Sequence, residues 1–375
     1  MFSHNDNLDV MGKNVPLKEK LVSAHHSIQQ KFPFVARVSI TVYDPGTRVL
    51  KTYLHSSGDD NPLENYEAVL DEAHSLKEIL NNGKPRVVNN LITFKNGPKK
   101  HTKRIENQGY AASYTMPMFV QGNFLGFLFF NSYEADVFTE AVLNELDVYG
   151  HLISLLVAND FNIIKMMNAA VKTTGNIVHS RDPETGSHLD RMSRYTRIIA
   201  TSLAEKYHLD DEYIEHVFMF SPLHDIGKVA IPDQILLKPG KLTEDEYKVM
   251  QTHSRKGREM IDDLIKNFGL NSLENLSILK NIAEYHHEAM NGSGYPAGIK
   301  DDEIPLEARI VAVADIFDAL TSKRPYKEAW SNEKAFATLQ SYAGETLDVD
   351  CVNALIQNKA AIELIQKQFK ENEIG

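Results

Sequence analysis

The sequence predicts a chain of two domains, an α+β domain and a region of helical character, joined by a long helix. Its 375 residues exceed the length of one average domain, and a hydrophobic content of 42% is sufficient for ordinary cores. Two hairpin signals between flanking helices indicate the α+β domain. The long helix follows from an apolar repeat that begins at Val142, and the helical region from apolar stretches after it, such as 217–226 and 308–320.

The first domain is expected over residues 16–141, after a polar and frayed stretch over 1–15. Pro16 can begin a helix over 17–30 because an N–H group would have no partner there. Two alternating stretches around Asp44-Pro45-Gly46 predict a hairpin. The later elements are expected to be a helix over 66–81 that ends at Gly83, where a left-handed cap is easy, a short strand over 86–89, a basic loop over 95–103, and a second hairpin made of 111–120 and 124–131.

A linker helix is expected over residues 142–177. Its apolar positions alternate in steps of four and three for about five heptads, and only Asp160 puts a charge into this seam. The seam consists of Val142, Leu146, Tyr149, Ile153, Leu156, Ile163, Met167, Ala170, Thr174 and Ile177. Such a helix predicts a parallel homodimer, and the alternative is a single helix packed on its own domain.

Composition excludes several classes of protein. The net charge is −11 without an extended basic block, so binding to a nucleic-acid polymer is not expected. The single cysteine, Cys351, excludes an intramolecular disulfide framework and suits a reducing compartment. Residues 1–6 lack the features of a signal peptide, and the most apolar runs, 124–130 and 152–158, are too short to span a bilayer. We expect a soluble, cytoplasmic protein.

His224 and Asp225 are neighbours in an otherwise apolar stretch that reads as helix over 217–226. Burying an unpaired carboxylate there would cost several kcal/mol, and a bound cation would remove this penalty. Histidine and aspartate side chains together suit a metal ion. For an isolated pair, the alternative is a core histidine beside a capped aspartate.

Further candidate ligands follow on segments of helical character, one of which begins at a capping box formed by Thr243 and Glu246. Glu184 and His188 are four positions apart, which puts them on one face of a helix. Asp315 lies in a stretch over 308–320 that is apolar nearly all round and is therefore expected to be buried. Together the candidates are five histidines and three carboxylates, more than one ion needs: Glu184, His188, His224, Asp225, His253, His286, His287 and Asp315. Imidazole and carboxylate donors without thiolates favour iron, manganese or a hydrolytic zinc.

The order of these motifs resembles the HD-GYP subgroup of the HD phosphohydrolase superfamily, over roughly residues 170–360. The supporting motifs are Glu-x-x-x-His, His224-Asp225-Ile226-Gly227-Lys228, His286-His287-Glu288, Gly294-Tyr295-Pro296 and the stretch 313–322. The resemblance implies an all-α HD-type helical bundle over 178–375 that hydrolyses cyclic di-GMP, to linear pGpG or to GMP, with two or three divalent metal ions. Iron is the expected metal and manganese the alternative. Residues 344–348 depart from the usual Gly-Thr-x-Phe-Asp, so the packing of the last helices is not predicted.

The resemblance carries the metal-ligand roles to the eight residues named above, with Glu184 as a carboxylate for a third ion. We interpret Asp225 as the bridging ligand, and expect a hydroxide shared between ions to attack the phosphate in line. Lys228 is the candidate cation for the scissile phosphate or the leaving oxygen.

Other residues are expected to contact the substrate. Arg324 and Lys327 follow the buried helix and suit a phosphate, although a solvated basic helix end is the alternative. Asp182 resembles a substrate-side position of the family. Gly294 permits a tight loop, and Tyr295 either supports the substrate wall or packs. The alternative functions are hydrolysis of 3',3'-cyclic GMP-AMP and a non-catalytic cyclic dinucleotide receptor, and the complete ligand set argues against the receptor.

The first domain resembles a GAF sensor domain. The resembling pieces are 75–80 with Gly83-Lys84-Pro85, Thr115-Met116-Pro117-Met118 with Gly126-Phe127-Leu128, and Phe138-Thr139-Glu140. GAF domains commonly bind a small ligand or serve as dimerisation platforms, so the resemblance implies regulation of the second domain. No cysteine is placed for attachment of a bilin or haem-type group. The GAF ligand is therefore unknown, and an architectural role is the alternative.

Overall fold

The computed structural model divides into two compact units within one long helix, between Ile163 and Ile164. It describes residues 6–58, 67–91, 109–179, 186–268, 275–322 and 328–370, and it leaves out the side chains of 165 and 167–186. Each unit is described by itself.

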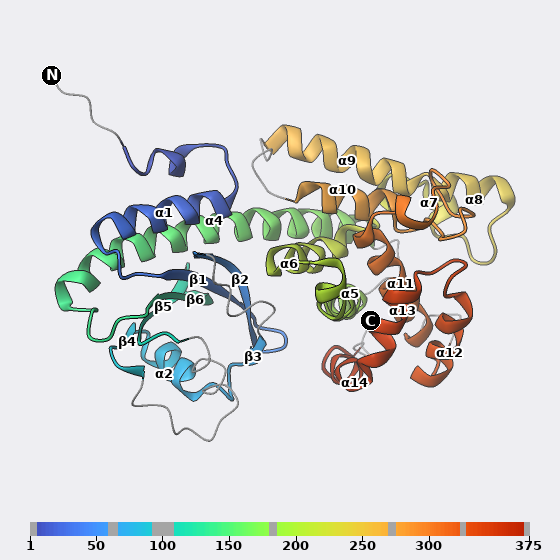
Figure 1. The fold of residues 1–375 in the computed structure, drawn as a ribbon. Coiled ribbons are helices and arrows are strands. Elements are labelled where there is room, and N and C mark those ends of the chain that lie inside the picture. The colour runs from blue at the N-terminus through green and yellow to red at the C-terminus, as the bar shows by residue number, and fades with distance from the viewer. Residues whose placement is uncertain are drawn as a thin grey trace. The chain divides into compact units, whose positions relative to one another are not determined.

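The N-terminal unit is built on a six-stranded antiparallel sheet with the strand order β3-β2-β1-β6-β5-β4 (Figure 1). The two predicted hairpins are present as β1–β2 and β5–β6, and β1 pairs with β6 between them. At the first turn, the Asp44 carboxylate accepts hydrogen bonds from Gly46 N and Thr47 Oγ1, each at 2.9 Å. The strands are β1 Arg37–Asp44, β2 Val49–Ser57, β3 Glu67–Val69, β4 Arg86–Val88, β5 Ala112–Val120 and β6 Asn123–Ser132.

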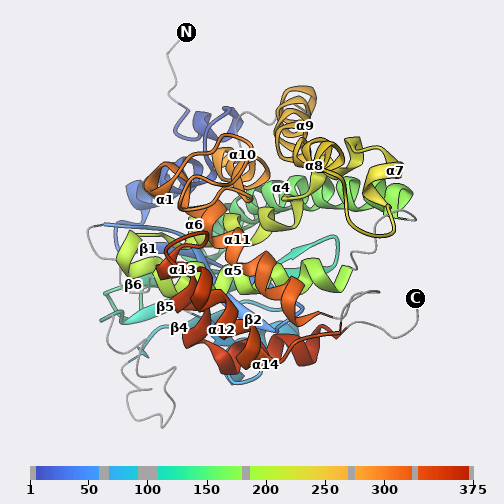
Figure 2. The same ribbon diagram turned by 90° about the vertical axis from the view of Figure 1, so that its right-hand side faces the viewer.

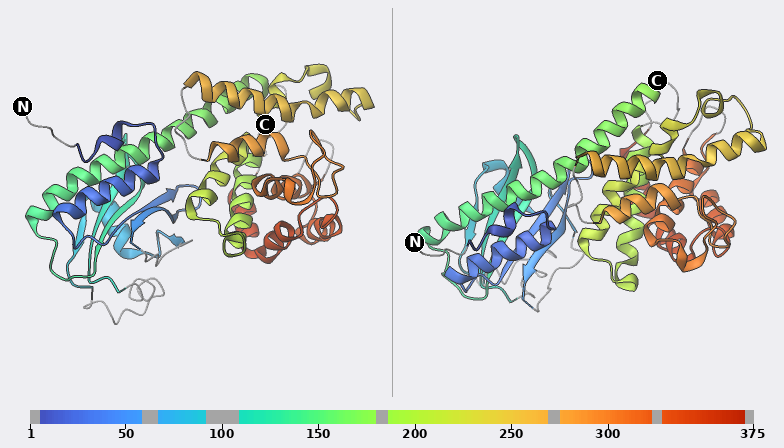
Figure 3. Two further views of the ribbon diagram at one scale, coloured as in Figure 1. Left: turned by 45° about the horizontal axis from the view of Figure 1, so that its top comes forward. Right: turned by 90° about the horizontal axis from the view of Figure 1, so that it is seen from above.

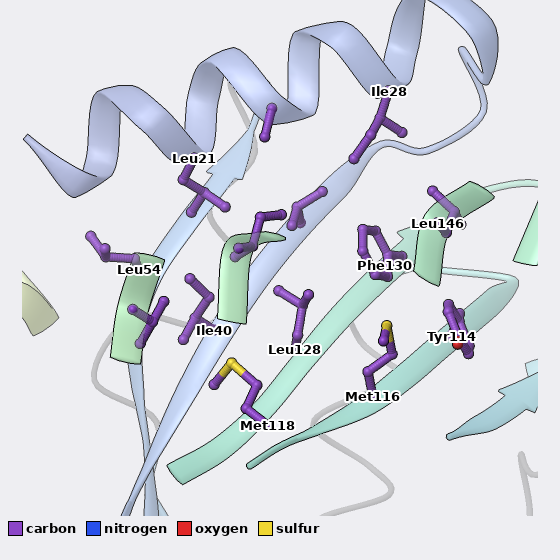
Figure 4. Close-up of a cluster of buried hydrophobic side chains, with 14 of the residues drawn as sticks. Leu21, Ile28, Ile40, Leu54, Tyr114, Met116, Met118, Leu128, Phe130 and Leu146 are labelled. Carbon is purple, nitrogen blue, oxygen red and sulfur yellow. The ribbon is translucent and has the colours of Figure 1, made fainter. Parts of the chain in front are cut away.

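Helices cover both faces of this sheet. Helix α1, Leu17–Lys31, and the first part of α4, Glu140–His179, bury one face. Figure 4 shows Leu21 and Ile28 of α1 over the sheet residues Ile40 and Leu128. Helix α2, His74–Asn82, covers the other face through a smaller core. As predicted, α2 ends at a left-handed Gly83, with φ of 60°.

Two predictions for the N-terminal unit are wrong in part. The helix expected from residue 66 begins only at His74, because Glu67–Val69 pair with the edge of β2, where Lys51 and Glu67 form an ion pair. The stretch expected to be frayed contains the 3-10 helix η1, Asp9–Gly12, and Asn7 donates a hydrogen bond of 2.7 Å to Gln30 of α1. The polar character of these two stretches did not predict their contacts with residues distant in the sequence.

The predicted linker helix is present as α4, one uninterrupted helix (Figure 3). Its seam residues Leu146 and Ile153, with Val157, are buried in the core of the N-terminal unit. This part of the seam packs on its own sheet, as in the alternative of a single helix packed on its own domain, and the homodimer stays a prediction. The segment Glu140–Ile164 is also long and apolar enough to cross a membrane, unlike the shorter run considered above. Its buried residues Leu146, Ile153 and Val157 belong to the core of the N-terminal unit, and 28% of the apolar window is buried.

Every named element in the described part of the C-terminal unit is helical. Helix α11 contacts α5, α10, α12 and α13 and is buried over most of its length (Figure 2). The predicted capping box opens α8: Thr243 N donates to Glu246 Oε2 at 2.7 Å, and Glu246 N donates to Thr243 Oγ1 at 3.3 Å. The elements are α5 Gly186–Tyr207, α6 Asp211–Phe220, η3 Ser221–Leu223, η4 Ile226–Ala230, α7 Asp233–Leu236, α8 Glu244–Gln251, α9 His253–Phe268, α10 Leu276–Tyr285, η5 Asp301–Glu303, α11 Leu306–Thr321, α12 Asn332–Tyr342, α13 Val349–Gln357 and α14 Lys359–Gln368.

The helix expected to run through the His-Asp pair is interrupted. Helix α6 ends at Phe220, and the pair lies between the 3-10 helices η3 and η4. Pro222 explains the break because it has no N–H to continue the α-helical ladder. The break turns both side chains out of the helical repeat and towards the centre of the unit, where their ring and carboxylate atoms meet other ligands.

Candidate metal centre

The predicted ligands in the described residues form two clusters. Asp225, His253, His286 and His287 make the first cluster; His188, His224 and Asp315 make the second cluster. Within each cluster the potential ligand atoms all lie within 4.8 Å of one another. The rings of His224 and His286, one from each cluster, have centroids only 5.1 Å apart. Seven residues spread over five segments of the chain therefore meet in one place, whereas Glu184 lies outside the described residues.

Asp225 lies between the two clusters. Its Oδ1 is 3.2 Å from His253 Nε2 and 3.6 Å from His286 Nε2, and its Oδ2 is 3.2 Å from His224 Nε2. Oδ1 is buried and makes no hydrogen bond within the described part of the chain. A buried anionic oxygen of this kind, surrounded by imidazole nitrogens, fits a divalent cation. The carboxylate thus lies within 4 Å of imidazole nitrogens from both clusters.

Backbone carbonyls fix the tautomers of three ligands. Nδ1 of His224 lies 2.9 Å from Ser221 O, Nδ1 of His253 lies 2.8 Å from Met250 O, and Nδ1 of His286 lies 2.8 Å from Ile282 O. A carbonyl oxygen only accepts, so each Nδ1 donates its proton and each neutral ring keeps a lone pair on Nε2. All three Nε2 atoms face Asp225.

His188 is held in the same way by a carboxylate that was not predicted as a site residue. Its Nδ1 lies 2.8 Å from Asp318 Oδ2, and its Nε2 lies 3.7 Å from Asp315 Oδ1. Asp318 is fully buried and also accepts hydrogen bonds from Arg191 and Ser322. A second carboxylate three positions after Asp315 in an apolar helix was the signal that could have indicated this role.

The electrostatics of the first cluster suit metal ligation. Burial lowers the pKa of His286, and burial together with the neighbouring His286 lowers the pKa of His287 well below its usual value. Both rings are therefore neutral near pH 7, as ligands must be. Burial would raise the pKa of Asp225, but the Lys228 ammonium and His224 hold it well below the usual range. The carboxylate is ionised and ready to bind a cation.

Gly227 explains the glycine of the His-Asp-x-Gly-Lys motif. A Cβ atom at this position would collide with the carbonyl of His253 and come within 2.5 Å of Gly257 N. Only a glycine lets η4 lie directly on the beginning of α9. The glycine therefore brings Asp225 and His253 together without itself being a ligand.

The predicted substrate residues are partly described. Lys228 Nζ lies 2.7 Å from Asp225 Oδ2, and its side chain is 21% exposed. The Tyr295 ring lies beside the His287 ring, with centroids 4.8 Å apart and planes inclined at 33°. A Cβ at Gly294 would collide with the backbone of Glu288 and Ala289, so the predicted tight loop is present. Asp182, Arg324 and Lys327 lie outside the described residues.

Solved structures similar to the N-terminal part are GAF domains. One is the phycocyanobilin-bound GAF domain of a cyanobacterial phytochrome, 14% identical, with a TM-score of 0.34 over 42% of this chain and 96% of that chain. Another is the GAF domain of an Acinetobacter phosphoenolpyruvate-protein phosphotransferase, 13% identical, with a TM-score of 0.34 over 42% of this chain and 91% of that one.

The C-terminal part is similar to curated bacterial proteins. The response regulator RpfG of Xanthomonas campestris, a cyclic di-GMP phosphodiesterase, is 47% identical over 192 residues, 51% of this chain and 48% of its own. A probable cyclic di-GMP phosphodiesterase of Vibrio cholerae is 43% identical over 208 residues, 54% of this chain and 47% of its own. A 3'3'-cGAMP-specific phosphodiesterase 2 of the same species is 36% identical over 227 residues, 58% of this chain and 41% of its own.

This chain thus spans about half the length of the curated relatives it matches. Residues 173–351 match the protein family described as HD domain. The matched region contains both ligand clusters and the His224-Asp225 pair between them. Over residues 173–351 this chain is therefore similar to the HD domain family.

Proposed function

We propose that this chain is a metal-dependent phosphodiesterase that hydrolyses cyclic di-GMP to linear pGpG or GMP. The observation that carries the proposal is the meeting of two ligand clusters at the single carboxylate of Asp225. Relatives that match half of this chain are named cyclic di-GMP phosphodiesterases, in Xanthomonas and Vibrio, which supports the substrate class.

The residues fit two or three divalent ions. Asp225, His253, His286 and His287 would hold one ion, and His188, His224 and Asp315 a second, with Asp225 shared and Glu184 available for a third. Bound divalent ions would supply an activated water and hold an oxygen of the scissile phosphate. Imidazole and carboxylate donors without a thiolate suit iron, and manganese is the alternative.

The chain's own residues orient the reaction. Carbonyl partners hold the proton of each neutral imidazole on Nδ1, which leaves Nε2 directed at Asp225 and available to a cation. Lys228, partly exposed beside Asp225, is proposed to contact the scissile phosphate or the leaving oxygen. Tyr295 is proposed as the substrate wall beside His287. Arg324, Lys327 and Asp182 are proposed to hold the rest of the substrate.

Hydrolysis of 3',3'-cyclic GMP-AMP is the second candidate, because relatives that match this chain at 33–36% identity carry that specificity in their names. A non-catalytic receptor is less well supported, since seven of the eight predicted ligands meet in the described residues, with Lys228 beside Asp225. We further propose that the GAF-like unit regulates hydrolysis in response to a ligand still to be identified, and that the chain acts in the cytoplasm as a homodimer.

The test combines metal analysis with chromatography of the products made from each cyclic dinucleotide by purified protein. Asp225→Ala is expected to lower kcat/KM by at least about a thousandfold. It should also reduce metal content, because both clusters lose a shared ligand. The matched control is Asp263→Ala, which changes an exposed aspartate of α9 and should retain both hydrolysis and metal content. Tight binding of a cyclic dinucleotide without any product from the metal-loaded wild type would favour the receptor instead.

A further inference from the structure

We propose that Glu288 is a positioning residue that fixes the loop 291–298, and with it Tyr295, against the first ligand cluster. The inference rests on the proposed function, because Tyr295 matters only if a substrate binds beside His287. Glu288 directly follows the ligands His286 and His287, and its N–H donates a hydrogen bond of 2.9 Å to Tyr285 O at the end of α10. Its backbone is therefore fixed to the same segment as the two imidazoles.

The Glu288 side chain points away from solvent and into the loop. The residue is only 6% exposed, although a glutamate usually remains in water. Its Oε1 accepts hydrogen bonds from two successive backbone groups, Ala297 N at 2.7 Å and Gly298 N at 3.1 Å. Its Oε2 is buried and makes no hydrogen bond to any residue that the structure describes. The burial of this carboxylate is thus compensated chiefly by the backbone of the loop.

The loop also contacts the ligand segment through its backbone. Tyr295 N donates to His287 O at 3.2 Å. A Cβ at Gly294 would come within 2.5 Å of Glu288 Cα and of His287 O, so a glycine is required for this approach. The loop is therefore attached on both sides of Tyr295, by the His287 carbonyl before it and by the Glu288 carboxylate after it.

These attachments determine where the Tyr295 ring lies. It is beside His287 at 4.8 Å and edge-on to His253 at 6.2 Å, measured between ring centroids. On its other side Tyr247 of α8 lies at 6.4 Å. Without the carboxylate, the N–H groups of Ala297 and Gly298 lose this partner, and the second half of the loop loses two of its attachments, although the hydrogen bond of 3.3 Å from Arg255 Nη2 to Pro296 O remains. Tyr295 would then leave the ligands that it borders.

The first test compares Glu288→Gln, Glu288→Asp and Glu288→Ala in the full, metal-loaded chain. Glutamine keeps an acceptor at the same reach and should retain kcat/KM within about threefold. Aspartate keeps the charge but is one methylene too short, and should lose about tenfold or more, like alanine. The loss should appear mainly in KM with metal content unchanged, and exposed Glu259→Ala is the control. Wild-type values for the aspartate and alanine variants, or loss of metal in proportion to activity, would overturn the proposal.

A double-mutant cycle tests the link to the tyrosine. If Glu288 acts by holding Tyr295, the loss caused by Tyr295→Ala should shrink at least threefold when Glu288 is already aspartate. Losses that simply multiply would mean that the two residues act independently, and the positioning role would be wrong.

Amide hydrogen exchange gives a readout that does not depend on activity. In Glu288→Asp, peptides covering 291–298 should exchange at least tenfold faster than in the wild type, while peptides from α11 stay unchanged. Equal exchange in both proteins would contradict the proposal even if activity fell. Should the metal-loaded wild type hydrolyse neither cyclic dinucleotide, the proposed function would fail, and the exchange experiment would still decide the role of Glu288.

Discussion

Asp318 shows how a residue outside the ligand set can determine the chemistry of a ligand. Burial would raise the pKa of this carboxyl, but hydrogen bonds from His188 and Arg191 outweigh that effect and lower it. Asp318 is therefore ionised, and it holds the proton of His188 on Nδ1. The Nε2 lone pair of His188 then faces Asp315 in the second cluster. A carboxylate–histidine pair of this kind orients the ring and makes it a stronger ligand.

Asp318→Asn is expected to weaken metal binding at the second cluster by about 10- to 100-fold. The amide preserves the size of the side chain, but the anionic partner of His188 and Arg191 is lost. Calorimetric titration of metal into depleted protein should show weaker binding at the second cluster and nearly unchanged binding at His253, His286 and His287. Asp263→Asn, on the exposed side of α9, is the control. An equal loss at both clusters would indicate general unfolding rather than a local role.

At the scale of elements, the contact between η4 and α9 depends on a missing side chain. Gly227→Ala would press a methyl group against the His253 carbonyl and Gly257 N. We expect the free energy of unfolding to fall by about 1–3 kcal/mol, and metal content to fall with it because Asp225 and His253 move apart. Urea unfolding and metal analysis measure the two effects. Gly12→Ala has open space around its Cβ and should change neither value.

Helix α6 contains a buried histidine that should make stability depend on pH. His216 is 4% exposed, its ring stacks on Phe220 at 5.3 Å, and burial lowers its pKa to about 4 from 6.5. Between pH 6.5 and about 4, His216 is therefore mostly neutral in the folded protein but mostly protonated in the unfolded chain. This contribution is complete above pH 6.5 and is lost as the pH falls towards 4, by about 3 kcal/mol over that window.

His216→Gln removes this titration and keeps a hydrogen-bonding amide near Asn275, which lies 3.1 Å from the imidazole. The free energy of unfolding of metal-free protein is measured with urea at pH 7.0, 5.5 and 4.5, chosen to span about that window. It should fall less steeply with decreasing pH in the variant than in the wild type. The metal ligands titrate in both proteins, so the difference isolates His216. His151→Gln, exposed on α4, is the control. A variant whose stability falls as steeply as that of the wild type would show that His216 accepts its proton in the folded state.

Prediction from the sequence succeeded where the signal was local and failed where it depended on distant contacts. The capping box of α8, the turn at Asp44 and the left-handed Gly83 follow from neighbouring residues alone. The ligands could be named because their motifs resemble a known family, and those in the described residues do converge. Asp318 and Glu288 were missed as site residues, because their roles depend on His188 and on the loop after Tyr295.

At the scale of the whole molecule, the first part of α4 contributes to the core of the N-terminal unit, and this limits which of its faces could contact another chain. The chain divides within this helix, and each unit has its own set of buried residues. Leu146, Ile153 and Val157 fill the core between α1, α4 and the sheet. On another side of the helix, Val148 and Leu155 are 69% and 68% exposed. A pairing helix over this part of α4 would therefore have to use a different face from the predicted seam.

The two possible uses of the seam can be separated by a pair of substitutions. Ile153→Ala should lower the free energy of unfolding by about 2–4 kcal/mol, because it leaves a cavity in a core residue that is 1% exposed. Leu155→Ala, two positions away on the exposed side, should stay within about 0.5 kcal/mol of the wild type. Light scattering of the native protein gives the mass, and urea unfolding of the same preparation gives the free energy of unfolding. If Ile153→Ala instead left stability unchanged and halved the mass, the seam would serve pairing between chains, because a buried core position cannot lose three carbons without a cost in folding.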